Sequence, residues 1–198
     1  MRIASSVLLA VCILNAASAA QARVIVTERS AFYAVEGASS QAIIASLDKN
    51  APLVLKDGRR FYAKTARALT WSYDYKERSR SCAVAGVRVM LDLVYTTPRW
   101  RPSRGAERAL LRQWNAFEKA VRRHEKGHGA IAKKSARRLA REIKRTRTQP
   151  TCAALDAAVR QRVAAFAEKG ADGRAAHERY DRRTGHGVRQ GAHFGPPR

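Results

Sequence analysis

The chain has 198 residues, 45% of them hydrophobic, which is enough for one compact domain with a core and too short for two ordinary domains. Lys and Arg number 39 against 16 Asp and Glu, so the formal net charge is +23. This balance predicts attraction to anionic partners such as nucleic acid, lipid headgroups or acidic envelope polymers, and it leaves the fold open.

The amino terminus, "MRIASSVLLAVCILNAASAA", has one basic residue, a short apolar run and then small residues. This is the layout of a secretory signal peptide, with cleavage after Ala19 or Ala22. The apolar run is too short to cross a bilayer as a helix. We therefore expect a signal peptide over residues 1–22 and one domain over 23–198, in a protein exported to the periplasm or secreted. Lipid attachment at Cys12 is a weaker alternative, because the apolar run continues past it.

Removal of the signal peptide leaves Cys82 and Cys152 in an oxidising compartment, which predicts a disulfide. In the chain-entropy model, a loop of about 70 residues closed in this way contributes on the order of 4 kcal/mol. Two separate buried thiols are the alternative. Export also argues against a nucleic-acid partner, and the chain carries no nucleic-acid module signature.

The first half of the mature chain reads as strands with one helix. Residues 23–35 predict one or two short strands, and residues 39–52 predict a helix that begins at Ser39 or Ser40 and ends before Pro52.

An antiparallel hairpin is the strongest β prediction, because two segments alternate apolar and smaller or polar residues around the charged turn "KERSRS". Pro98 and Pro102 are expected to end this sheet region. The alternating apolar positions are Leu69, Trp71, Tyr73 and Tyr75, then Val87, Val89, Leu91, Leu93 and Tyr95.

From Ala106 to Arg145 the apolar period changes to steps of three and four, which predicts one long helix with an apolar stripe. The stripe includes His124 and His128. Basic residues face away from it and form the solvated side: Arg122, Arg123, Lys126, Lys133 and Lys134.

His124, Glu125 and His128 form a His-Glu-x-x-His motif on this helix. Two imidazoles one turn apart present their nitrogens to a common point, and the glutamate reaches a water in an open coordination position, as zinc chemistry requires. The alternative is that both histidines are core residues with hydrogen-bond partners. Gly127 and Gly129 each weaken the helix by about 1 kcal/mol relative to alanine. These glycines either leave room for the metal or another strand to approach the helix closely, or they break the helix.

Several motifs in this order resemble domain-of-unknown-function family 922, described as secreted bacterial zinc-dependent proteases. The resemblance covers nearly the whole mature chain. It implies that His124 and His128 bind a metal, that Glu125 is the catalytic acid and base, and that the Tyr-Asp-x-x-Thr-x-His-Gly segment forms part of the site. The resembling segments are 32–37, 65–75, Cys82, 111–129, Cys152 and 180–192.

A catalytic zinc needs a third protein ligand. We expect His186, an imidazole on a glycine-flanked loop of that segment, with Asp181 as the alternative ligand or as an acceptor that orients a ligand histidine. Tyr180 is expected either to donate to a developing oxyanion or to be a core or lid residue. His177 and His193 are expected to stand outside the site.

Together these features predict an α+β, zincin-like fold, in which an antiparallel sheet packs on the long His-Glu-x-x-His helix and a carboxyl-terminal helix and segment close the site. The predicted function is a secreted zinc metallopeptidase that cleaves peptide or protein substrates, including cell-wall peptides, through a zinc-activated water with Glu125 as general base.

One alternative is a non-catalytic basic protein that binds an anionic envelope polymer or membrane surface. Another is a structural zinc with a fourth protein ligand from His177 or Asp181. The sequence does not indicate an oligomeric state.

Overall fold

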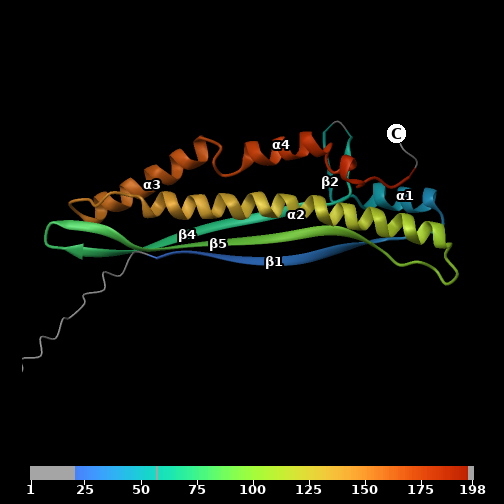
Figure 1. The fold of residues 1–198 in the computed structure, drawn as a ribbon, viewed down its shortest axis with the longest axis horizontal. Coiled ribbons are helices and arrows are strands. Elements are labelled where there is room, and N and C mark those ends of the chain that lie inside the picture. The colour runs from blue at the N-terminus through green and yellow to red at the C-terminus, as the bar shows by residue number, and fades with distance from the viewer. Residues whose placement is uncertain (1–20, 57, 196–198) are drawn as a thin grey trace, which may run out of the picture.

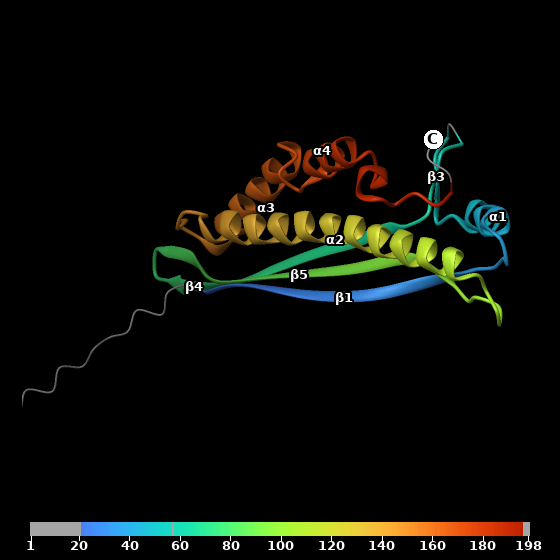
Figure 2. The ribbon, with the colours of Figure 1, turned by 45° about the vertical axis from the view of Figure 1, so that its right-hand side comes forward.

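A computed structural model describes residues 21–56 and 58–195 of the chain. A three-stranded sheet forms one layer, the long helix α2 (Arg108–Lys144) lies along one face of it, and α3 and α4 lie over α2 (Figures 1 and 2). The mixed α+β class is therefore confirmed. The remaining elements are β1 (Gln21–Val35), α1 (Ser40–Asn50), β2 (Leu53–Val54), β3 (Arg60–Phe61), β4 (Lys64–Arg78), β5 (Ser81–Trp100), α3 (Cys152–Glu168), α4 (Arg174–Thr184) and the 3-10 turn η1 (Val188–Gln190).

The predicted hairpin is present as β4 and β5, which pair antiparallel. Trp71 pairs with Val89, and Trp71 packs against the core cluster that Val89 forms with residues of the sheet, α2 and α3. Leu69 and Tyr75 are the exceptions among the predicted apolar positions, because both are exposed. The third strand corrects the sequence prediction. β1 is one continuous strand that runs parallel to β5, so the sheet is mixed rather than antiparallel throughout. Alternation of apolar and polar residues indicates a strand and which of its faces is apolar, but it does not indicate which strand, distant in sequence, pairs with it.

The prediction that Pro98 ends the sheet is wrong, because Pro98 lies within β5, in register with Tyr33 of β1. The register with β4 stops at Thr96, so β5 has a partner on only one side beyond that residue. Proline, which has no backbone N–H, is tolerated at position 98 because no strand pairs with that side of β5 there.

The predicted helix over residues 106–145 corresponds to α2. Its first half packs Trp114 and Phe117 against Trp100 and Phe194, in an aromatic cluster with ring centroids 5.4 to 5.7 Å apart. Its second half packs small and aliphatic residues against the sheet and α3. Full burial of a side chain such as Phe117 contributes about 1.5–3 kcal/mol. Buried residues occur from Leu110 to Ile143, so α2 is packed along nearly its whole length.

Both helix glycines allow close approaches and neither breaks α2. A Cβ at Gly127 would overlap the hydroxyl end of Tyr180 from α4, and a Cβ at Gly129 would overlap the hydroxyl of Tyr95 from β5. Tyr95 in turn donates a 2.6 Å hydrogen bond to Glu28, which also pairs with Lys133 at 2.9 Å. The two glycines therefore set how closely α4 and the sheet approach α2.

Gly129→Ala should lower the free energy of unfolding by about 1–3 kcal/mol, although alanine favours helices, because overpacking outweighs propensity. Adding Tyr95→Phe removes the overlapping oxygen and leaves the ring carbons at 3.0 and 3.2 Å from the new methyl. The double variant should then be more stable than the sum of the two single effects predicts. Urea unfolding of all four proteins measures this coupling, and strict additivity would contradict the packing described.

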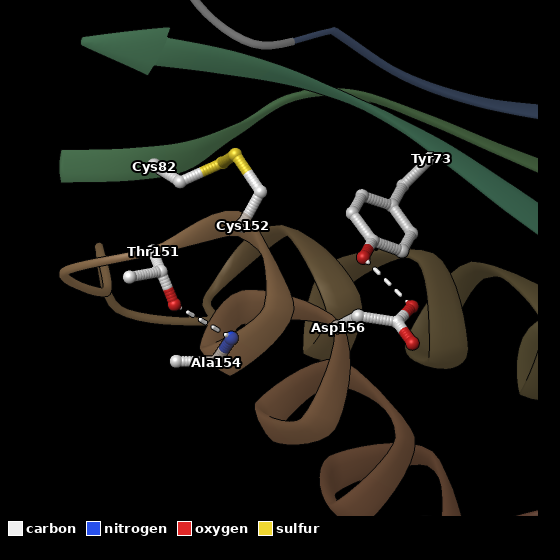
Figure 3. The surroundings of a disulfide bond; sticks show 6 residues. All are labelled: Tyr73, Cys82, Thr151, Cys152, Ala154 and Asp156. Atoms are coloured by element: carbon white, nitrogen blue, oxygen red, sulfur yellow. Dashed lines mark hydrogen bonds between the residues drawn. A yellow bond between two sulfur atoms is a disulfide. The ribbon is translucent and has the colours of Figure 1, made fainter. Parts of the chain in front are cut away.

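The predicted disulfide joins Cys82 in β5 to Cys152, the first residue of α3, with Cα atoms 5.1 Å apart (Figure 3). The neighbouring loop is fixed as well, because Cys82 and Gln149 exchange two backbone hydrogen bonds of 2.7 and 2.9 Å. Tyr73 of β4 donates to Asp156 of α3 at 3.0 Å. The start of α3 is therefore fastened to the sheet at several points.

Replacing Cys82 and Cys152 together with alanine should lower the free energy of unfolding by about 4 kcal/mol, the amount expected for a closed loop of about 70 residues. Denaturant unfolding measures the difference. A reducing agent should destabilise the wild type alone, and an equal effect on the double variant would show that another process is responsible.

The signal peptide predicted for residues 1–22 lies outside the described residues except for Gln21 and Ala22, which begin β1. Cys12 also lies outside them. Among the described residues, no helix is both long and apolar enough to span a membrane.

Candidate metal centre

One face of α4 meets the middle of α2. His177, Tyr180, Asp181 and Thr184 follow each other at steps of three, one and three along α4, which is the spacing of a single helical face. The ring of Tyr180 stacks on His124, with centroids 5.0 Å apart and an interplanar angle of 12°. The glycine at position 127 lets this face come close enough to bring Asp181 to the two histidines of α2.

Three ligand atoms converge at this contact. Asp181 Oδ1 lies 3.3 Å from His124 Nε2 and 3.0 Å from His128 Nε2. The two Nε2 atoms lie 3.2 Å apart. Among the described residues, His124, His128 and Asp181 form a group able to hold a metal ion.

The residues present fit a zinc ion. Four ligands at the usual distance of about 2.0–2.1 Å form a tetrahedron whose edges are about 3.3 Å, and the three separations here are close to that value. Asp181 Oδ1 is buried and has no hydrogen bond of acceptable geometry, although both nitrogens are near. Because the two Nε2 atoms and Asp181 Oδ1 converge on one point, a metal ion at that point can contact all three, which a single proton cannot do. Burial raises the pKa of Asp181, but the two histidines outweigh it, and the net pKa is well below its usual value.

The other ring nitrogens of the two histidines are also engaged. His128 Nδ1 lies 2.8 Å from His177 Nδ1, and His124 Nδ1 lies 3.2 Å from Gln190 Oε1. Burial, together with the nearby Arg67, lowers the pKa of His177 to about 4, so its imidazole is neutral at pH 7. Such contacts hold the two rings so that their Nε2 atoms would face a bound metal ion.

Glu125 lies beside this group on α2, where its side chain is buried. Thr65 of β4 donates a 2.6 Å hydrogen bond to Glu125 Oε2. Burial raises the pKa of Glu125, while the Thr65 hydrogen bond and the two histidines oppose that rise. The carboxylate thus lies at the β4 side of the ligand group, while Asp181 lies at the α4 side.

The remaining predicted site residues take different positions. His186 lies at the rim, with φ of +50° between two glycines, and its Nδ1 is 3.8 Å from Asp181 Oδ1. Its side chain is 41% exposed, and among the described residues the group that could hold a metal ion contains Asp181, the alternative ligand, and not His186. Tyr180 donates to the carbonyl oxygen of His124 at 3.2 Å, so its hydroxyl is turned to the backbone of α2.

A cavity of about 610 Å³ opens onto His124, Glu125, His128 and Asp181. This size suits a ligand of several residues or a drug-sized molecule. Its other walls come from the β2 and β3 hairpin, β4 and the carboxyl-terminal segment, and they include Leu53, Leu55, Arg60, Phe61, Lys64, Arg67, Val188 and Phe194.

Sequence reasoning missed His177, Thr65 and Gln190 as supporting residues. For His177 a signal was present, since it precedes Asp181 by four residues and Tyr180 by three on a helical segment. Thr65 and Gln190 lie in two of the segments that carry the family resemblance, but nothing in the sequence assigned a role to either residue, because these roles follow only from the approach of β4 and η1 to α2.

The model of a family described as bacterial protein of unknown function (DUF922) matches residues 30–187, and the chain belongs to this family. No curated protein matches the chain. No solved structure matches it either.

Mature protein supplied with zinc should bind about one ion per chain, and Asp181→Ala, like His128→Ala, should lose it, because each removes one of three ligands. His186→Ala should retain it, since its ring lies outside the ligand triangle. Elemental analysis after dialysis gives the zinc content. Loss in His186→Ala together with retention in Asp181→Ala would assign the third ligand to His186.

Proposed function

We propose that the protein is a zinc-dependent peptidase of the zincin type. The observation that carries the proposal is the convergence of His124 Nε2, His128 Nε2 and Asp181 Oδ1 beside the buried carboxylate of Glu125, in a cavity open to solvent. Three protein ligands leave one coordination position for water or substrate, which is the arrangement of catalytic rather than structural zinc sites.

A zinc ion held by these residues would supply a Lewis acid that polarises a carbonyl and lowers the pKa of water. Glu125 accepts the proton of the attacking water and delivers it to the leaving nitrogen as the peptide C–N bond breaks, which leaves a carboxylic acid and an amine. Thr65 holds the Glu125 carboxylate from β4, so that its orientation is set before substrate arrives. His177 and Gln190 orient the two histidine rings.

The cavity walls suit a peptide substrate. Leu53, Leu55 and Phe61 supply apolar surface, and Arg60 and Arg67 supply positive charge. We propose that the substrate is a peptide or protein of the cell envelope, encountered in the periplasm or outside the cell, where the signal peptide expected at residues 1–22 would direct the chain. Cross-linked cell-wall peptides, which are acidic, would be attracted by the positive charge of these two arginines.

Glu125→Gln should keep about one zinc per chain and lower turnover by about 10²-fold to 10⁴-fold, because it removes the proton acceptor and preserves the shape of the side chain. The assay uses zinc-loaded protein and a quenched fluorescent peptide library that includes acidic sequences. Glu118→Gln, on the outer surface of the same helix, is the matched control and should retain the wild-type rate.

Two results would contradict the proposal. One is a Glu125→Gln variant with the turnover of the wild type. The other is the absence of any chelator-sensitive cleavage by wild-type protein whose full zinc content has been verified.

A further inference from the structure

Two kinds of residue line the cavity of about 610 Å³ at the metal centre. One kind is polar and includes the ligand residues and Glu125, which carry the proposed chemistry. The other kind is apolar and has no role in that chemistry, although it comes from the β2 and β3 hairpin, α2, η1 and the carboxyl-terminal segment. The apolar residues, which we call the apolar lining, include Leu53, Leu55, Phe61, Val121, Val188 and Phe194.

The buried part of the apolar lining adjoins the metal centre. Val121 is 4% exposed and Phe194 is 3% exposed. Val121 precedes His124 by three residues and Glu125 by four on α2, so it lies one turn away on the same face of the helix. Phe194 is fixed by its packing in the aromatic cluster of α2. A group bound at the ligand residues therefore has apolar surface close beside it.

The exposed part of the apolar lining comes from two elements that are far apart in sequence. Leu53 of β2 is 41% exposed and Val188 of η1 is 54% exposed. A single exposed apolar side chain is ordinary on a protein surface. Two that line one cavity, together with buried apolar residues, form a surface from which an apolar group of a ligand would displace water, and such burial is favourable.

The hairpin that carries Leu53 and Phe61 is fastened at its base. It stands apart from the three-stranded sheet, beside the carboxyl-terminal segment (Figures 1 and 2). The ring of Phe61 contacts the ring of His186, with centroids 4.8 Å apart. The next residue, Tyr62, donates a 2.8 Å hydrogen bond to Asp48 of α1. An apolar surface held in this way loses little conformational entropy when a ligand binds.

We propose that the apolar lining binds a large apolar side chain of the peptide substrate, such as leucine, methionine or phenylalanine, beside the bond that is cleaved. This inference rests on the proposed peptidase function. The occupant is identified by the continuity of the apolar lining with the metal centre through Val121, and by a volume that accommodates a side chain together with several residues of backbone. Arg60 and Arg67 line the same cavity, so the substrate can be acidic at other positions.

The first test compares two quenched fluorescent alanine hexapeptides that differ only at the third position, which is phenylalanine or serine. Every other position is alanine, so the peptide can bind in the register that places phenylalanine in the apolar lining. Zinc-loaded mature protein should cleave the phenylalanine peptide with a kcat/KM about tenfold or more higher, as expected for a specificity pocket that buries an apolar group.

Leu53→Ser should lower kcat/KM for the phenylalanine peptide about tenfold and leave the serine peptide nearly unaffected, because only the former uses the apolar surface. Val54→Ser is the matched control. Val54 is the next residue of the same strand, is 52% exposed and is absent from the residues that line the cavity, so this variant should retain the wild-type preference.

The second test measures binding without turnover. Zinc-loaded Glu125→Gln protein is titrated calorimetrically with the same two hexapeptides, blocked at both ends and without fluorophores. The phenylalanine peptide should bind more tightly and with a more negative heat-capacity change, the sign of apolar burial, and Leu53→Ser in the same background should remove the difference.

The outcomes separate this inference from the proposed function. Chelator-sensitive cleavage of both peptides at equal rates would overturn the apolar preference and leave the peptidase in place. Binding of the phenylalanine peptide that depends on Leu53, without cleavage by wild-type protein of verified zinc content, would support the apolar site and contradict the peptidase. If Leu53→Ser changes the mass in sedimentation equilibrium instead of peptide binding, the surface is an interface between two copies of the chain, and the proposal is overturned.

Discussion

The packing of α2 on two sides at once is the constraint on which the rest of the structure depends. One side lies on β5, where Gly129 admits Tyr95, and another lies under α4, where Gly127 admits Tyr180. A helix between two layers needs small residues wherever a neighbour approaches closely, and these two glycines give up about 1 kcal/mol each of helix propensity to allow it. The rotation of α2 that follows turns His124 and His128 towards α4 and Glu125 towards β4.

The metal centre is therefore a product of layer packing. Asp181 reaches the two histidines because α4 approaches α2 through the contact between Tyr180 and Gly127. Its oxygen lies among two nitrogens without a satisfactory hydrogen bond, which is unfavourable unless a cation is bound. Metal binding at such a site stabilises the folded chain, since the unfolded chain does not hold the three ligands together.

The positive side chains lie in two kinds of place, on solvated surfaces and around a cavity. Most of the excess of Lys and Arg lies on solvated surfaces, where a single charge contributes little to stability and mainly affects association. A second cavity, between α2 and α3, gathers several of these cations, because Arg138, Arg147, Arg162 and Lys169 all line it. The two cavities lie at different places along α2.

Local patterns in the sequence determined the hairpin of β4 and β5, the long helix, the disulfide pair and the histidines one turn apart, because each depends on a short period or on the chemistry of two residue types. Other features were decided by the tertiary structure alone: the parallel pairing of β1 with β5, the position of Pro98 inside a strand, and the approach of Asp181 to His124 and His128. The physical reason is the same in each case. A repeat along the chain fixes which face of an element is apolar, whereas the partner that meets that face, and the side chain it brings, depend on contacts between residues far apart in sequence.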